Sequence, residues 1–208
     1  RMKPPGFTTP DGRFFPLGTD SLGRDVLARI IYGSRISLSV GLSAVLIAGL
    51  SGVLLGVVAG FYGGVVDDVI MRWADIQLAF PFILLAISIL AVLGPGVEKL
   101  VIVLGISQWM QYGRLARAQT IALREYEFVV AARAVGANNA ALIFRHILPN
   151  IMGPVIVIAS FSVASTIITE ASLSYLGLGV PPSVPTWGAM LADGRSFIER
   201  APWLCLYP

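Results

Sequence analysis

Long apolar runs separated by short polar segments dominate this chain. From Ile36 to Val66 no Asp, Glu, Lys, Arg or His occurs, and this run exceeds the roughly 20 apolar residues that a helix needs to cross a bilayer. The pattern predicts a membrane-spanning helix over about 36–62. Within it Gly52, Gly56 and Gly60 recur at every fourth position. They are either a helix-packing face, since this spacing puts them on one side of a helix, or simply small residues that fill a bilayer helix.

Three further spans are predicted, over about 76–93, 99–113 and 151–169. Pro81 is expected to kink the first of them near its start, because proline lacks the amide hydrogen that a helix uses. The uncharged part of the second, Leu100–Gly113, falls short of the roughly 17 residues that set the lower limit for a span. We still place it in the membrane, because the helical pattern continues through Arg114 and Arg117 at the interface.

The uncharged stretch that follows Glu170 is not expected to be another span. Three prolines, Pro181, Pro182 and Pro185, occur there together with several glycines. A helix facing lipid must satisfy all of its backbone hydrogen bonds internally, and these residues prevent that. Residues 171–208 are therefore predicted to form a re-entrant or external loop.

Composition agrees with a membrane protein. Hydrophobic residues make up 56% of the 208 residues and charged residues only 13%, outside the usual range of soluble domains. Lone Cys205 and lone His146 exclude a disulfide framework and a Cys/His metal site. The net charge of +3 is spread along the chain, which argues against a nucleic-acid partner. The predicted fold is an all-α, polytopic membrane helix bundle in one domain.

The amino-terminal segment, residues 1–35, is rich in proline, glycine and charge. Apolar residues from Val26 to Ile31 have helical spacing, so a short helix is predicted there, with the run Thr19-Asp20-Ser21 as its cap. The chain starts at Arg1 and stops inside an apolar stretch. We expect it to be a fragment that lacks its first and last membrane helices.

The stretch over residues 114–150 is the longest internal segment that water must solvate. Its charged residues are Arg114, Arg117, Arg124, Glu125, Glu127, Arg133, Arg145 and His146. A first amphipathic helix carries an apolar stripe made of Phe128, Ala131, Ala132 and Val135. Gly136 is predicted to end it.

A second short helix is predicted over 140–148, capped by Asn138 or Asn139 and bounded by Pro149. Two short helices around a glycine suggest a DNA-binding helix-turn-helix, but the second is too apolar to read a groove. Helices of this length are marginal alone in water. A protein partner that holds them is the economical explanation.

Three motifs occur in order along the chain. Leu17–Asp25 reads Leu-Gly-Thr-Asp-Ser-Leu-Gly-Arg-Asp, and Leu173–Gly179 reads Leu-Ser-Tyr-Leu-Gly-Leu-Gly. Between them lies an alanine pair, Ala131-Ala132, followed by Gly136 and later by Leu148-Pro149. Together they resemble the inner-membrane permease subunits of ABC importers, specifically the C-type subunits of dipeptide, oligopeptide and nickel systems. The resemblance covers essentially the whole chain.

The resemblance implies a type I ABC importer permease fold whose 114–150 loop seats on a cytoplasmic ATPase. The loop positions concerned are Val130, Ala131, Ala132, Arg133, Gly136, Ala137, Arg145, His146, Leu148 and Pro149. Two positions depart from the family pattern: Val130 stands where it has glutamate, and His146 where it often has isoleucine. Ion pairs attributed to that glutamate are therefore not carried over.

The resemblance also implies partners. They are a second homologous permease that completes the translocation path, two cytoplasmic ATPase subunits or domains, and an extracytoplasmic substrate-binding protein, all at the inner membrane of a bacterium or archaeon. The chain has no Gly-rich loop ending in Lys-Ser/Thr, so ATP is expected on the partners. We expect this chain to bind no cofactor. Di- or oligopeptides are the expected cargo, and nickel or another small solute is the alternative.

A cytoplasmic loop at 114–150 puts residues 1–35 and the tail after Glu170 outside, by strict alternation. More Lys and Arg then lie outside than inside, against the positive-inside rule, so the expected orientation depends on the loop alone. Glu170 is either a functional acid at membrane depth or a hydrogen-bonded carboxylate at the lipid boundary. It is the one residue that favours a rival interpretation, in which the protein is a secondary transporter. An enzyme is disfavoured because the spans offer no nucleophile paired with a base.

Overall fold

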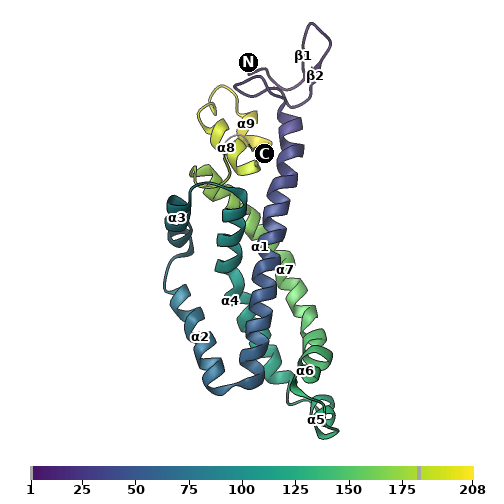
Figure 1. Ribbon diagram of the computed structural model, residues 1–208. Coiled ribbons are helices and arrows are strands. Elements are labelled where there is room, and N and C mark those ends of the chain that lie inside the picture. Colours follow the sequence, from purple (N-terminus) through teal and green to yellow (C-terminus); the bar gives the residue numbers. More distant parts are fainter. Residues whose placement is uncertain (1, 182–183) are drawn as a thin grey trace. The chain divides into compact units, whose positions relative to one another are not determined.

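The computed structural model describes residues 2–181 and 184–208 and is mainly helical (Figure 1). Arg1 and Pro182, used above, lie outside this range. The elements are β1 (Phe7–Thr8), β2 (Phe14–Phe15), α1 (Val26–Tyr62), α2 (Gly64–Leu78), α3 (Phe82–Leu93), α4 (Val97–Leu123), α5 (Glu127–Ala134), α6 (Asn139–Ala141), the π-helical turn η1 (Leu142–Ile147), α7 (Leu148–Tyr175), α8 (Trp187–Arg195) and α9 (Trp203–Leu206). They form two compact units, described separately below.

The first unit comprises Arg1–Leu42, Ile87–Val101 and Ser165–Pro208. Its strands β1 and β2 pair antiparallel, with Phe7 opposite Phe15. A small apolar cluster joins the first turn of α1 to α8 and α9. Its buried members are Val26, Met190, Ala201 and Leu204.

The second unit comprises Ser43–Ala86 and Ile102–Ala164, and its centre is a seam between α1 and α4. A Cβ added at Gly56 would overlap the carbonyl oxygen of Gly113 and lie 2.9 Å from Ala116 Cβ. The seam pairs Gly52 with Trp109 and Tyr112, Gly56 with Gly113 and Ala116, and Gly60 with Arg117 and Thr120. This is the close approach that the four-residue spacing predicts, and it requires glycine because the facing backbone leaves no room for a side chain.

An apolar core surrounds this seam. It is built from the second half of α1, from α4, from η1 and from the first half of α7. Its buried residues are Val45, Ala48, Val53, Val57, Tyr112, Ala116, Leu123, Ile147, Ile151 and Val155. The glycine seam therefore lies inside the packed part of the unit.

The predicted separate helix in the amino-terminal segment is wrong. Val26–Tyr62 is one helix of 37 residues, so the short helix and the first span are continuous. Residues 33–35, which separate the two predicted helices in the sequence, are themselves helical. Gly33 is closely approached instead, since a Cβ there would lie 3.4 Å from the Pro185 carbonyl oxygen.

The predicted span over 76–93 is not one helix. It is interrupted between Leu78 and Phe82, and the two helices that flank the break are bent by 82°. Pro81 explains the break, because it lacks an amide hydrogen and forces the preceding residue out of the helical region. The kink prediction was right, but α2 starts at Gly64, earlier than the pattern indicated.

The boundaries of the 114–150 segment also differ from the prediction. Helix α4 continues to Leu123, so the loop begins there. At the other side Asn139–Tyr175 runs as one long helix, and Pro149 does not bound it. The π-helical turn η1 ends at Ile147, two residues before Pro149. Such a widened turn changes the hydrogen-bond partners and lets the helix pass a proline whose nitrogen cannot donate.

Two helical stretches are long and apolar enough to cross a membrane, Val26–Tyr62 and Asn139–Tyr175, and the bent pair α2 and α3 counts as a third if it forms one span. The predicted third span over 99–113 is not in this set among the described residues. Its helix also carries Glu98, Lys99, Arg114 and Arg117, which lower its mean hydropathy.

The glycine seam gives a first prediction. Gly56→Ala should lower the free energy of unfolding by about 1–3 kcal/mol, because the new methyl group overpacks a filled site. Thermal unfolding of the protein in detergent measures this. Gly49→Ala is the matched control, since Gly49 lies in the same helix and an added Cβ would be 3.7 Å from the nearest atom, Tyr112 Cε1, an ordinary contact distance. There stability should stay the same or rise by up to about 1 kcal/mol. Equal midpoints for the two variants would contradict the assignment of the seam.

Candidate coupling loop and buried carboxylates

The loop between α4 and α7 has a defined local structure. Helix α5 ends in a turn in which Gly136 takes φ +94°, a region that favours glycine. The amides of Gly136 and Ala137 donate to the carbonyl oxygens of Arg133 and Ala132, both at 3.0 Å, and this pair of bonds closes the helix end. The Asn138 side chain then accepts from the amide of Ala141 at 2.8 Å, which caps α6 as expected.

The predicted apolar stripe of α5 is not the face that packs on the chain. The fully buried residue of this helix is Val129. On the stripe, Phe128 is 42% and Val135 90% exposed, and Ala131 is exposed as well. An apolar helix face thus stays uncovered by the described part of the chain, beside the buried Val129 that holds the helix in place.

The remaining loop positions distribute over both sides of the turn. Val130, at the position that departs from the family pattern, is 49% exposed. Arg145 and His146 lie in η1, whose buried residues are Leu142 and Ile147. The His146 ring is 6.4 Å from the Phe128 ring, centroid to centroid, so the two halves of the loop touch. Leu148 and Pro149 belong to the first turn of α7.

Two arginines assigned to the loop by sequence belong instead to a contact between α4 and α2. The guanidinium of Arg117 binds Asp67 with two bonds, from Nε to Oδ1 and from Nη2 to Oδ2, the latter 2.5 Å long. Arg114 pairs with Asp75 at 2.8 Å. The sequence contained one signal for these pairs, because acidic residues in α2 and basic residues in α4 occur within otherwise apolar helices. Such charges are normally paired.

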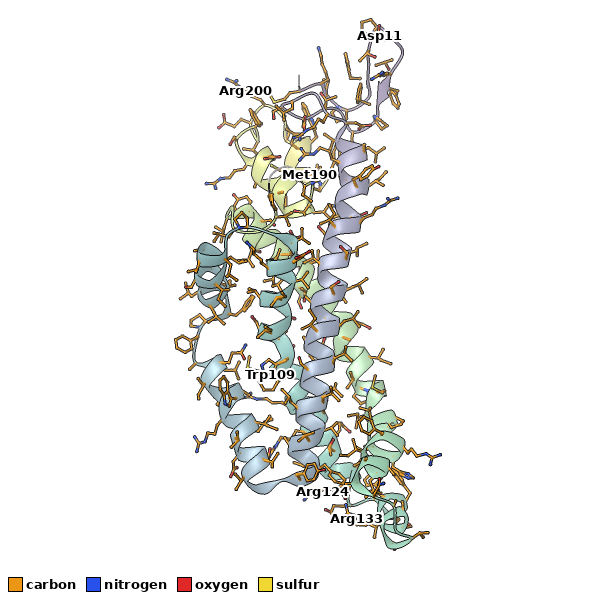
Figure 2. All side chains as sticks on the ribbon, in the orientation of Figure 1. Asp11, Trp109, Arg124, Arg133, Met190 and Arg200 are labelled. Carbon is orange, nitrogen blue, oxygen red and sulfur yellow. The ribbon has the colours of Figure 1, made fainter. Side chains whose placement is uncertain are left out.

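The same helix pair is joined by amide and indole groups. Trp109 donates from Nε1 to the Gln77 side chain at 2.9 Å, and Gln77 donates to the carbonyl oxygen of Ile106 at 3.0 Å. Figure 2 shows Trp109 at α4 on the side of α2. Together with the two ion pairs, these bonds hold α2 along the length of α4.

Glu170 lies in the first unit and is fully buried. It accepts hydrogen bonds from Ser174 at 2.7 Å and from Ser37 at 3.3 Å, and Ser37 Oγ also receives the amide of Trp187 at 3.4 Å. The carboxylate thus links α7 and α1 and, through Ser37, the start of α8. The hydrogen bonds agree with a carboxylate that is held by its neighbours, while the role of Glu170 in transport stays a prediction.

Asp20 does not cap α1, contrary to the prediction. Asp25 takes that place, accepting from the amide of Leu27 at 2.9 Å. Asp20 instead binds two guanidinium groups, those of Arg24 at 2.6 Å and Arg29 at 2.8 Å. Burial opposes its ionisation, yet hydrogen bonds from the Arg24 amide and guanidinium hold the pKa of Asp20 below its usual 3.8.

Arg29 extends this network to α8, because its second nitrogen lies 3.3 Å from Asp193. Sequence reasoning missed the network, since residues 20, 29 and 193 show no common periodicity. Within the described ranges, no three His, Cys, Asp or Glu side chains come together as a metal site.

The chain is similar in sequence and in fold to known proteins. Residues 52–205 match the family described as binding-protein-dependent transport system inner membrane component. A dipeptide transport system permease protein, DppC, of Alkalihalophilus pseudofirmus is 49% identical over 92% of this chain and 63% of that protein. The glutathione permease GsiD of Pectobacterium atrosepticum is 44% identical over 92% of the chain and 64% of its own length. The oligopeptide permease OppC of Escherichia coli is 46% identical over 95% and 65%.

The chain therefore spans a little under two thirds of the length of these relatives. A solved structure of the MetNI methionine ABC transporter in an inward-facing conformation has a TM-score of 0.67 at 16% identity, over 84% of this chain and 83% of that one. This likeness shows the fold, that of a type I ABC importer permease. The chain belongs to the family of binding-protein-dependent transport system inner membrane components, and within it matches the C-type peptide permease subunits.

Proposed function

We propose that this chain is the membrane-spanning permease subunit of an ATP-driven importer for di- or oligopeptides. With a second homologous permease it forms the translocation path in a bacterial or archaeal inner membrane. Two cytoplasmic ATPase subunits or domains bind the ATP, and an extracytoplasmic binding protein delivers the cargo. This chain itself is non-catalytic and binds no cofactor. The family match and helices long enough to span a membrane support this proposal.

The observation that carries the coupling role is the uncovered face of α5. Its apolar side chains are exposed while Val129 fixes the helix from behind, and the turn at Gly136 sets the second half of the loop against it. Small residues at Ala131 and Ala132 permit close approach of a partner helix. The loop thus offers a preformed surface for a protein such as a cytoplasmic ATPase.

Peptide cargo is supported by the relatives, whose names specify dipeptide, oligopeptide and glutathione transport. An importer of nickel or another small solute with the same architecture is the second candidate. A secondary transporter is less well supported, because Glu170, the residue on which it rests, already accepts hydrogen bonds from two serine hydroxyl groups. Uptake assays with the assembled importer and a labelled dipeptide, against labelled nickel, separate the first two.

The docking role predicts the effect of a bulky residue on the exposed face of α5. Ala131→Trp should weaken co-purification of the ATPase from detergent extracts roughly tenfold or more, because the indole props the two surfaces apart and a loss of about 1.4 kcal/mol already gives that factor. The amount of permease in the membrane should not change, since Ala131 is exposed. Ala28→Trp is the matched control, because Ala28 is also exposed but lies near the start of α1. A full complement of ATPase on the Ala131→Trp variant would refute the docking site.

The proposed orientation is tested at Ser21. In a Cys205→Ser background, Ser21→Cys should react with a membrane-impermeant maleimide in intact cells, because the proposal places residues 1–35 outside. The unmodified background without the new cysteine serves as control. Reaction only after the cells are permeabilised would reverse the topology.

A further inference from the structure

The junction of α1 and α2, residues 60–67, comprises the end of α1, Gly63 and the first turn of α2. It is contacted by the end of α4 and by the coupling loop, residues 124–147 between α4 and α7. Arg124 donates from Nη1 to the carbonyl oxygen of Gly60 at 3.1 Å, which places a cation on the carboxyl end of α1, where it is favoured. The Arg133 guanidinium of α5 lies 5.9 Å from the centre of the Phe61 ring, within the range of a cation–π contact. Figure 2 labels both arginines at this end of the second unit. A displacement of α5 would therefore act directly on Phe61.

Helix α2 lies between two interruptions of helical structure. At its start, Gly63 and Gly64 take φ +65° and +53°, a conformation that glycine enters and leaves at little cost. At its end lies the interruption before Phe82, with the 82° bend. Hinges are a few residues at element ends that absorb changes in φ and ψ. A straight helix with such a point at each end can rotate without being deformed.

The Asp67–Arg117 pair is the contact best suited to set the position of α2. It is bidentate, a geometry that adds directional specificity. Its side chains are only 15% and 35% exposed, whereas Asp75 and Arg114 are 60% and 51% exposed. The Asp75–Arg114 pair has one printed bond, from Nη2 to Oδ1, and so defines the direction of contact less closely. Asp67 also follows the glycine turn closely, so the pair acts near the hinge that Phe61 adjoins.

We propose that α2 pivots at Gly63–Gly64 when the coupling loop and the end of α4 move, and that Asp67 and Arg117 are the positioning pair that makes the first turn of α2 follow α4. The proposal rests on the docking of an ATPase at the loop. The Arg133–Phe61 contact joins the coupling loop to the end of α1. The ion pair joins the start of α2 to α4.

The experiment follows the movement of α2 in the assembled transporter, without requiring a known cargo. Arg72→Cys in a Cys205→Ser background places one thiol on the exposed side of α2. Its rate of reaction with a maleimide is measured in the nucleotide-free complex and after trapping with ATP and vanadate. The rate is expected to differ roughly two- to thirtyfold between the two states, the range that corresponds to typical coupling energies.

Three further substitutions in this background test the pair. Asp67→Asn should abolish the rate difference while the ATPase still co-purifies, because the loop surface is intact. Phe61→Leu keeps apolar bulk, removes the cation–π contact and should have the same effect, which provides a second test if Asp67→Asn does not assemble. Asp75→Asn is the matched control on the same two helices and should preserve the difference.

The outcomes are distinct. A rate difference that persists in both Asp67→Asn and Phe61→Leu overturns the inference. So does the lack of any difference in the Arg72→Cys background when the ATPase co-purifies, and this result leaves the proposed function standing. Failure of the ATPase to co-purify with that background overturns the proposed function, and the inference with it.

Discussion

The close approach of α1 and α4 is the constraint on which the second unit depends. Between membrane helices the surrounding lipid is as apolar as the side chains, so association relies on close packing. Glycine at 52, 56 and 60 allows the backbone of α4 to lie directly against α1. Because the glycines fix the rotation of both helices, the direction of the other side chains of α4 is fixed as well.

The neighbouring side of α4 carries the polar groups that hold α2, and Trp109 and Arg117 belong to both sides. Arg117, Arg114 and Trp109 meet Asp67, Asp75 and Gln77. A charged side chain in an apolar environment is costly, and it is most costly when it has no partner of opposite charge. The pairing thus specifies the position of α2 more than it adds stability. The carboxyl end of the same helix brings Arg124 to the last turn of α1, so one helix face organises the region beside the coupling loop.

The first unit relies on buried polar contacts of another kind. Glu170 joins α7 to α1 through two serine hydroxyl groups, and Asp20 gathers Arg24 and Arg29. Arg29 in turn reaches Asp193 of α8. Asp20 accepts from two amides and two guanidinium groups and Glu170 from two hydroxyl groups, and such partners lower the cost of burying a carboxylate. These contacts give the irregular segments around α8 a defined structure that their own short helices would not supply.

The sequence by itself determined the features that depend on neighbouring residues. The apolar run of the first span, the glycine spacing, the break at Pro81, the turn at Gly136 and the Asn138 cap all follow from local backbone chemistry, and the motif order indicated the family. Only the tertiary structure decided that Val129 and not the predicted stripe is buried, that residues 26–35 continue into the first span, and that Arg117 belongs to α2 and not to the loop. The physical reason is that a periodic pattern reports that a helix has two faces, whereas the partner of each face depends on how distant segments pack. Asp67 and Arg117 are 50 residues apart in sequence. The residues next to either one do not indicate that the other is its partner.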